Sequence, residues 1–303
     1  MSTAANTANT ANTANNVLAV IGGSGLYNME RLENRELVAV STPFGDPSDR
    51  VLRGTLDGTN VLFLPRHGKG HRINPSGINY RANICALKKL GATHLVLVSA
   101  VGSMKETIHP GDVVLADQFI DLTKHRVSTF FDEGPVVHVS MADPVCPLML
   151  DAASKACEAA GATFHCGGTY VCVEGPQFST RAESLVYRSW GASVIGMTNM
   201  PEVKLAREAE LPTCVLALVT DYDCWHQSQA PVTAASVIVM LSKAVGTATR
   251  ILDHLAPTLP NRNLSPASHA LQDAFASKLV LADPIRQRLA WLVEPYLDAG
   301  VKP

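Results

Sequence analysis

The chain has 303 residues, of which 47% are hydrophobic and 17% are charged, with a formal net charge of −2 and a pI of about 6.5. This is the composition of a globular protein, and its near-neutral charge gives no support to binding of nucleic acid or of an anionic membrane surface. No apolar run reaches the ~18 residues of a membrane-spanning helix, and no signal peptide pattern opens the sequence. We therefore expect neither a nucleic-acid partner nor a membrane partner.

Seven cysteines are spread along the chain, at positions 85, 146, 157, 166, 172, 214 and 224. None of them forms a C-x-x-C pair, and several stand inside apolar runs. This pattern indicates buried free thiols in a reducing compartment rather than a disulfide frame or a zinc site. We therefore expect a cytoplasmic protein.

Residues 1–16 are a low-complexity tail with repeated Thr-Ala-Asn, predicted to be disordered because it has no apolar face to bury. From Val17 onward, strand and helix patterns alternate. Asp57-Gly58 predicts a hairpin, and the next helix has Ser76 as a possible N-cap. In chain order the predicted elements are strands 17–21, 51–56 and 61–64, helix 78–90, strands 94–98 and 113–116, helix 148–160, strand 170–173, helix 181–190, strand 194–195, helix 202–210, strand 214–219 and helix 234–255.

The alternation predicts an α/β fold with a mixed, twisted central sheet flanked by helices. The hairpin makes the sheet mixed rather than purely parallel. We expect residues 17–303 to form one domain, with a C-terminal helical extension from about residue 260. Two helices, roughly 267–280 and 284–298, are predicted within that extension.

Two aspartates stand where the strand 214–219 ends, in the stretch Thr220-Asp221-Tyr222-Asp223. On an extended backbone Asp221 and Asp223 would point to the same side, about 7 Å apart. Two carboxylates that close repel each other, so at least one pKa is expected to rise, which would let that group hold and donate a proton near neutral pH. The pair suits a 6-aminopurine leaving group, although the carboxylates could equally cap the following turn.

Phosphate-type donors follow three other predicted strands. Ser24 lies in a Gly-Gly-Ser-Gly turn that could form an anion nest or simply a tight turn. This turn matches neither G-x-G-x-x-G nor a P-loop. Arg66 could hold a phosphate with two N–H groups and His67 could donate another contact, or the two could be a surface pair. Ser99 again places a hydroxyl just past a strand.

Other ligand-type groups also follow predicted strands. Phe178 could stack on a flat ring, and Met197-Thr198 offers a sulfur and a hydroxyl, although core packing explains Phe178 and Met197 equally well. Because strand ends of an α/β sheet can converge on one crevice, we expect these groups to meet there.

Six stretches, in order, resemble the S-methyl-5′-thioadenosine phosphorylases of the trimeric purine nucleoside phosphorylase family. The resemblance covers about residues 17–255. The stretches begin at Ile21 (IGGSG), Thr42 (TPFG), Pro65 (PRHG), Glu174 (EGPQFS), Met197 (MTNMPE) and Thr220 (TDYDCW).

The resemblance implies phosphorolysis of 5′-methylthioadenosine to adenine and 5-methylthioribose 1-phosphate, with inorganic phosphate as co-substrate and no metal or organic cofactor. It implies a homotrimer in which His138 reaches a neighbouring subunit's site. By position, phosphate would be bound by Ser24, Arg66, His67, Ser99, Ala100 and Thr198. Purine and ribose would be surrounded by Phe178, Ser179, Met197, Asp221, Tyr222 and Asp223. The 5′-methylthio pocket would be lined by His138, Val232, Ala234, Val237 and Ile238.

As a mechanism, Asp221 would carry the proton that N7 of adenine receives, and Asp223 would hold the 6-amino group. A smaller residue at Ala234 than is usual in the family suggests a roomier 5′ pocket. Four alternatives remain open: a broader purine nucleoside phosphorylase that also uses adenosine, a hydrolytic nucleosidase, a catalytically silent nucleoside-binding protein and a dinucleotide enzyme. A panel of nucleoside substrates tests for the broader phosphorylase, and omission of phosphate from the assay tests for the hydrolytic nucleosidase.

Overall fold

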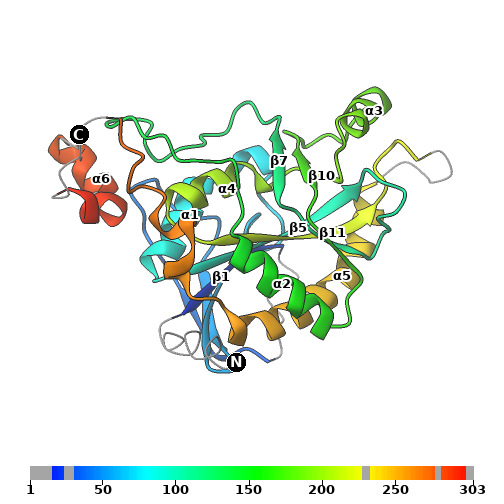
Figure 1. Ribbon diagram of the computed structural model, residues 1–303, viewed down its shortest axis with the longest axis horizontal. Helices are drawn as coiled ribbons and strands as arrows, with labels where there is room; N and C mark the ends of the chain where they lie inside the picture. Colours follow the sequence, from blue (N-terminus) through cyan, green and yellow to red (C-terminus); the bar gives the residue numbers. More distant parts are fainter. Residues whose placement is uncertain (1–15, 24–30, 227–232, 277–280, 298–303) are drawn as a thin grey trace, which may run out of the picture.

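The computed structural model describes residues 16–23, 31–226, 233–276 and 281–297, with the side chains of residues 234–239, 241 and 242 outside the description. In this part of the chain, eleven strands form one mixed sheet with helices on both faces (Figure 1). The predicted fold class, a single α/β domain around a mixed sheet, is confirmed.

The strands run in the order β2-β3-β4-β1-β5-β10-β9-β7, while β11 pairs with β5 and β6, and β6 pairs with β8. Their bounds are β1 Val17–Gly22, β2 Glu33–Val38, β3 Val51–Leu56, β4 Thr59–Pro65, β5 His94–Ser103, β6 Val113–Leu115, β7 Gln118–Asp121, β8 Phe164–Cys166, β9 Thr169–Cys172, β10 Val194–Gly196 and β11 Thr213–Asp221.

Helices α1 and α4 contact each other over one face of the sheet, and α2 and α5 contact each other over the opposite face (Figure 1). The helices are α1 Tyr80–Lys89, α2 Pro147–Ala159, α3 Arg181–Ser189, α4 Asn199–Glu208, α5 Ala234–Leu255 and α6 Asp283–Val293. Short 3-10 turns are η3 Pro75–Gly77, η4 Ala256–Thr258, η5 Arg262–Leu264, η6 Pro266–His269 and η7 Glu294–Tyr296. None of the helices, as far as their residues are described, is long and apolar enough to cross a membrane.

Alternation along the central strands divides the core into two layers. On β5, Leu95 and Leu97 pack in the layer that contains α1 and α4, whereas Val96 and Val98 pack in the layer that contains α2 and α5. Successive side chains of a strand point to opposite faces, so a continuous apolar run fills both layers at once. This is why the short apolar runs of the sequence identify the central strands.

Three strands of the structure are not predicted from the sequence. Strand β2 is a polar edge strand whose residues are mostly exposed, so it has no apolar run. Strands β7 and β8 are only four and three residues long and mix polar with apolar side chains. Edge strands of this kind are defined by backbone pairing rather than by burial.

Two predictions about helices are wrong: the N-cap of α1 and the existence of the first C-terminal helix. Helix α1 is capped by Asn79, whose side chain accepts a hydrogen bond from the N–H of Ala82, whereas Ser76 lies in η3 and donates to Glu174. Residues 267–276 form a 3-10 turn and further turns rather than the first predicted C-terminal helix, while the second predicted helix corresponds to α6 followed by η7. Pro266 opens the short turn, and Ser265 caps it through the N–H of Ala267.

Candidate functional site

A change of neighbour along β5 opens a space at the strand ends. Strand β1 pairs with β5 as far as Leu97, and β10 pairs with the same strand at Gly102 and Ser103. Strands β1 and β4 end at Gly22 and Pro65, beside the middle of β5. In α/β sheets, ligands bind where neighbouring strands diverge in this way.

Arg66 lies in this space and is almost entirely buried. Its Nε and Nη2 donate to the two carboxylate oxygens of Glu202 at 2.6 and 2.8 Å, and Nη1 and Nη2 also donate to the carbonyls of Val98 and Ile21 at 2.8 and 3.3 Å. Burial opposes its charge, but the Glu202 carboxylate raises the pKa of Arg66, so the guanidinium stays protonated. Of its five N–H groups, one on Nη1 is left for a ligand.

His67 is fixed as a neutral ring with one defined tautomer. Burial, followed by the charge of Arg66, lowers the pKa of His67 to about 3. Its Nδ1 lies 2.8 Å from the carbonyl oxygen of Ile73, which can only accept, so Nδ1 carries the proton. Nε2 therefore offers a lone pair, and His67 is an acceptor at that atom rather than the donor that the sequence suggested.

Three hydroxyls converge near Arg66, from Ser99, Thr198 and Tyr170. Ser99 follows Val98, whose carbonyl accepts from Arg66, and Tyr170 pairs with Val194 of β10, the strand that Thr198 follows. Burial raises the pKa of Tyr170, with smaller opposing effects from Ser99, Arg66 and Thr198. Neither Ser99 Oγ nor the Tyr170 hydroxyl, however, has a partner at good hydrogen-bonding geometry within the described residues. Unpaired buried hydroxyls are unfavourable, so an oxyanion placed among them would supply the missing acceptor.

Asp221 is the last residue of β11 and carries the best candidate for a stored proton. The Thr220 hydroxyl lies 2.7 Å from Asp221 Oδ2 and 3.2 Å from the carbonyl oxygen of Val101. A hydroxyl has a single proton, and the carbonyl can only accept it. When Asp221 is ionised, Thr220 donates to Oδ2; when Asp221 is protonated on Oδ2, it can donate to Thr220, whose own proton is then free for the carbonyl of Val101.

The pKa of Asp221 points the same way. Burial raises it, hydrogen bonds from Thr220 and from the N–H of Asp223 partly oppose the rise, and the charge of Asp223 adds a smaller increase. Burial also raises the pKa of Asp223. The predicted rise is confirmed, but its main cause is loss of solvent rather than repulsion between the carboxylates.

The extended geometry predicted for residues 221–223 is wrong. The strand ends at Asp221, and residues 223–225 form a turn in which Asp223 has a φ of +52°. The N–H of Asp223 donates to Asp221 Oδ1 at 2.8 Å. The first aspartate thus accepts a backbone hydrogen bond from the second, as in an Asx turn, and the turn brings Asp223 into a buried position.

The turn also joins Asp223 to the segment that follows β9. The Cys224 thiol donates to the carbonyl of Ser179 at 3.2 Å, so Ser179 lies beside the aspartates. Phe178, next to it, is 46% exposed. Tyr222 and Met197 are half-buried, with the Met197 sulfur packed so closely on Gly175 that a Cβ there would lie 2.5 Å from it.

Strand β5 links the two halves of the site. Ser99 belongs to the hydroxyl group near Arg66, whereas Gly102 lies against Asp221, with Ala100 between them. Three residues of strand span about 10 Å, which is room for a pentose between an anion and a heterocycle. Ser99 is therefore inside a strand, not past its end as predicted, because β5 continues through pairing with β11 and β10.

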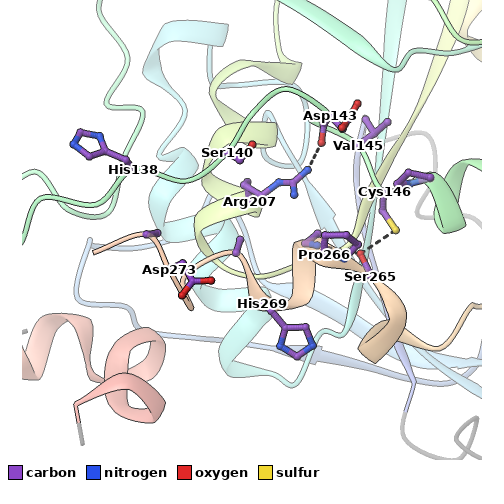
Figure 2. A pocket seen from close by; sticks show the side chains of 14 residues that line it. His138, Ser140, Asp143, Val145, Cys146, Arg207, Ser265, Pro266, His269 and Asp273 are labelled. Carbon is purple, nitrogen blue, oxygen red and sulfur yellow. Dashed lines mark hydrogen bonds between the residues drawn. The ribbon is translucent and has the colours of Figure 1, made fainter. Parts of the chain in front are cut away.

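His138, predicted to reach a neighbouring subunit's site, lies away from this one, and five other predicted residues are not described. His138 is exposed on the wall of a separate cavity of about 360 Å³, between the segment 138–147, Arg207 and the segment 265–274 (Figure 2). That cavity contains none of the strand-end residues, and the buried, partly unpaired groups at the strand ends are the better chemical site. Ser24 and Val232, and the side chains of Ala234, Val237 and Ile238, lie outside the described residues.

Three residues of the site were given no role by the sequence analysis: Glu202, Tyr170 and Arg126. Glu202 is fully buried, but its partner Arg66 is 136 positions away, and no local pattern reveals such a pair. Tyr170 reads as an ordinary strand residue. Arg126 stands in a segment between predicted elements, where an arginine is normally a surface residue.

No group of three or more potential metal ligands gathers anywhere in the described ranges. The groups that the structure brings together at the strand ends are the Asp221 carboxyl, whose pKa is raised, and buried hydroxyl, guanidinium and imidazole groups.

The chain is similar to known proteins over most of its length. The model of the phosphorylase superfamily matches residues 17–257. A relative from Geobacter sulfurreducens, named S-methyl-5′-thioadenosine phosphorylase, is 50% identical over 283 residues, which cover 93% of this chain and 99% of the relative.

Solved structures are similar as well. The crystal structure of a methylthioadenosine phosphorylase from an Antarctic soil metagenomic library superposes with a TM-score of 0.85 at 50% identity, covering 92% of this chain and 99% of that one. An adenosine/methylthioadenosine phosphorylase variant from Schistosoma mansoni, in complex with adenine, gives a TM-score of 0.77 at 36% identity, covering 80% and 91%. The chain belongs to the phosphorylase superfamily.

Proposed function

We propose that the chain catalyses phosphorolysis of 5′-methylthioadenosine to adenine and 5-methylthioribose 1-phosphate, as part of purine and methionine salvage. Support comes from the printed activity of relatives that match almost the whole chain. The observation that carries the proposal is the half-buried Asp221 carboxyl, whose pKa is raised by loss of solvent, one short strand segment away from a group of anion-type donors.

In this reaction the sugar carbon develops positive charge as its bond to the purine breaks, in the manner of glycoside cleavage. Asp221 gives its proton to N7, so the base leaves as neutral adenine. Thr220 then keeps its own proton and donates it to the new carboxylate, a contact of 2.7 Å. Phosphate beside the ribose stabilises the positive carbon and bonds to it.

Phosphate would be held by directed contacts rather than by net charge, because Glu202 already neutralises Arg66. The residues proposed to bind it are Ser24, Arg66, His67, Ser99, Ala100 and Thr198. The lone pair on His67 Nε2 would accept the proton that hydrogen phosphate still carries at neutral pH. Arg66 would add its one remaining N–H.

The base side would be formed by Phe178, Ser179, Met197, Tyr222 and Asp223. An ionised Asp223 accepts the 6-amino group of adenine but meets the carbonyl of a 6-oxopurine unfavourably. A site built around such a contact discriminates strongly against a substrate that leaves it unpaired. We therefore assign adenine nucleosides, not inosine, as substrates.

The 5′ end of the nucleoside would lie against Val232, Ala234, Val237 and Ile238, together with His138 of the partner subunit in a homotrimer. His138 is exposed in the single chain, which leaves it available for such a contact. All seven cysteines are unpaired, which supports a location in the cytoplasm.

Residues 1–16 are proposed to be a tail outside the fold and residues 17–303 one domain. The extension after residue 260 is proposed to be part of that domain because Trp291 of α6 packs on Phe130 and Phe44, with ring centroids 5.0 and 6.4 Å apart.

The decisive experiment measures adenine release from 5′-methylthioadenosine with and without phosphate. Phosphorolysis requires release only when phosphate is present, with equimolar formation of the sugar phosphate. Release without phosphate would identify a hydrolase, and no release in either condition would leave a binding protein. Assays with adenosine measure the preference for the 5′-methylthio group, and assays with methylthioinosine measure the preference for the amino group at purine position 6.

A further inference from the structure

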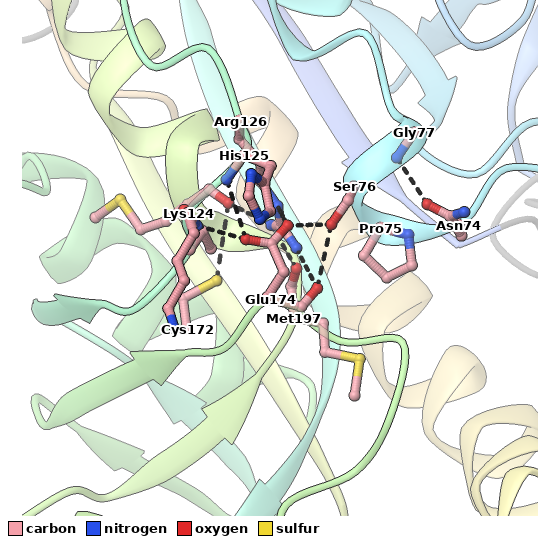
Figure 3. Close-up of polar contacts among 12 residues, drawn as sticks. Asn74, Pro75, Ser76, Gly77, Lys124, His125, Arg126, Cys172, Glu174 and Met197 are labelled. Atoms are coloured by element: carbon pink, nitrogen blue, oxygen red, sulfur yellow. Dashed lines mark hydrogen bonds and ion pairs between the residues drawn. The ribbon is translucent and has the colours of Figure 1, made fainter.

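Arg126 occupies a junction between the two loops that carry the proposed substrate contacts. It follows β7, and its side chain has no exposed surface. Nη1 donates to the carbonyls of Met197 and Met200 at 2.7 and 2.6 Å, and Nη2 donates to the carbonyl of Glu174 at 2.7 Å. One guanidinium thus satisfies three backbone carbonyls from the segments after β9 and β10 (Figure 3).

Glu174 completes the arrangement from the other side. Its carboxylate accepts hydrogen bonds from the N–H groups of Lys124 and His125 and from the Ser76 hydroxyl, and it lies 3.4 Å from Arg126 Nε (Figure 3). Burial acts to raise the pKa of Glu174, but these hydrogen bonds and the charge of Arg126 lower it to about 2. The carboxylate is therefore ionised throughout the range in which an enzyme assay is run.

The carbonyls held by Arg126 belong to residues beside the proposed contacts. Met197 immediately precedes Thr198, on the phosphate side. Glu174 begins the loop that leads to Phe178 and Ser179, on the purine side. The two loops also touch directly, since a Cβ on Gly175 would lie 2.5 Å from the Met197 sulfur.

We propose that Arg126, backed by Glu174, is a positioning residue that sets the distance between the phosphate side and the purine side of the site. This rests on the proposed function, because phosphorolysis needs the attacking oxygen and the leaving base aligned on one sugar carbon. A misplacement of about 1 Å between reacting groups can cost about 10²-fold in rate, even when its source is remote from the chemistry. A planar guanidinium serves three carbonyls at fixed angles, whereas an ammonium group cannot.

The test compares three enzymes: the native protein, Arg126→Lys and Arg126→Ala. For each, it measures kcat, the KM for nucleoside, the KM for phosphate and the midpoint of thermal unfolding. The lysine variant keeps the positive charge but loses the planar guanidinium with its several N–H groups. We expect its kcat to fall about 10- to 100-fold at temperatures where it is fully folded. The alanine variant should regain kcat when guanidinium ion is added at low concentration, while ammonium ion of the same charge should not restore it.

Arg207→Lys is the matched control. Arg207 is also a buried arginine that donates to a backbone carbonyl, that of Asp143, but it lies on the separate cavity. We expect this variant to lose thermal stability at unchanged kcat.

If Arg126→Lys lowers only the thermal midpoint and keeps native kcat and KM values, Arg126 is a structural residue and the proposal is wrong. Equal rescue by guanidinium and ammonium would also overturn it, because charge alone would then suffice. If the native enzyme itself releases no adenine in a phosphate-dependent manner, the proposed function fails instead, and the two failures are told apart by the native control.

Discussion

At the scale of single residues, Asp221 shows how burial creates a usable acid. Asp221→Asn removes the transferable proton but keeps the shape and the acceptor at Oδ1. We expect kcat for adenine release to fall about 10²- to 10⁴-fold, which is the usual contribution of a general acid, with little change in the thermal midpoint.

Asp253→Asn is the matched control for this change. Asp253 is likewise an aspartate whose pKa is raised, mainly by burial, but it lies on α5 and pairs with Arg31. The control should keep native kcat. Near-native turnover of Asp221→Asn would remove Asp221 from the mechanism.

The tautomer of His67 leads to a prediction about anions. Sulfate has no proton at neutral pH, so it would place an oxygen lone pair against the lone pair of Nε2. We expect sulfate to compete with phosphate at least about tenfold more weakly than arsenate, which carries a proton as phosphate does.

The variant His67→Gln tests the cause, because its amide can donate an N–H instead. In competition assays against phosphate, this variant should show a smaller difference in inhibition constant between arsenate and sulfate than the native enzyme does. Sulfate binding as tightly as arsenate to the native enzyme would contradict an acceptor at this position.

Single-sequence reasoning found the residue types of the site but not their contacts. Asp221, Arg66 and Ser99 were identified because polar residues next to a buried strand are conspicuous. The backbone reversal at Asp223 was missed because an aspartate that follows a strand pattern does not by itself indicate a φ of +52° or a backbone hydrogen bond to Asp221. Glu202 and Arg126 were missed because their partners are distant in sequence, and burial of a charge is a tertiary property.

At the scale of elements, the end of β5 must lie close to β11. A Cβ added to Gly102 would lie 2.8 Å from Asp221 Oδ1 and 3.2 Å from the N–H nitrogen of Asp223. Gly102→Ala should therefore displace the acid, lowering kcat by about 10²-fold while the fold is retained at a cost of about 1–3 kcal/mol. Steady-state kinetics and a thermal melt measure both effects, and a native kcat would show that the aspartate does not need this space.

Gly246 provides the opposite case within helix α5. It is exposed, and the nearest atom to an added Cβ is 3.9 Å away. Because glycine is a poor helix former, Gly246→Ala should stabilise the protein by about 0.5–1 kcal/mol without changing kcat. A denaturant titration measures the difference, and a loss of stability would mean that the helix is constrained at this position by contacts other than its own backbone.

Elements with a strong apolar pattern were predictable, and those defined by pairing or turn chemistry were not. Helix α5 has the predicted bounds, 234–255, because its wide apolar face follows the helical period. The end of β5 was placed at Val98, since Ser99, Gly102 and Ser103 look like a turn when their strand partners are unknown. The proline-rich segment near Pro266 favours short turns over the helix that periodicity suggested.

At the scale of the whole molecule, the alternating strand and helix patterns were enough to give the fold class, because each central strand must fill two core layers. The pattern could not give the strand order, and the order creates the site. The replacement of β1 by β10 along β5 is a property of the assembled sheet, so convergence of the strand ends was an expectation that required the structure.

The same burial that shapes the core makes stability depend on pH. Burial lowers the pKa of His94 to about 4 and that of His67 to about 3. Between these values and the ordinary histidine pKa of about 6.5, the unfolded chain binds more protons than the native protein, so stability falls as pH falls through that window. Each histidine should cost about 2 kcal/mol of unfolding free energy between about pH 7.5 and pH 5.

Carboxyls with a raised pKa, such as Asp221, act in the opposite direction, so a pH series on the native protein alone does not separate out the contribution of the histidines. Comparing the native protein with His94→Gln isolates the contribution of His94, because the carboxyl contributions are the same in both proteins and cancel. The glutamine amide can still donate to the carbonyl of Pro260, which His94 Nε2 contacts at 2.9 Å. The variant should be less stable near pH 7.5, and the gap to the native protein should narrow by about 2 kcal/mol near pH 5. His67→Gln should narrow its own gap similarly, and the double variant should show the sum, since His67 lies in the turn after β4 whereas His94 begins β5. A gap that stays constant with pH in urea titrations would mean that these rings are protonated as easily in the folded protein as in the unfolded chain.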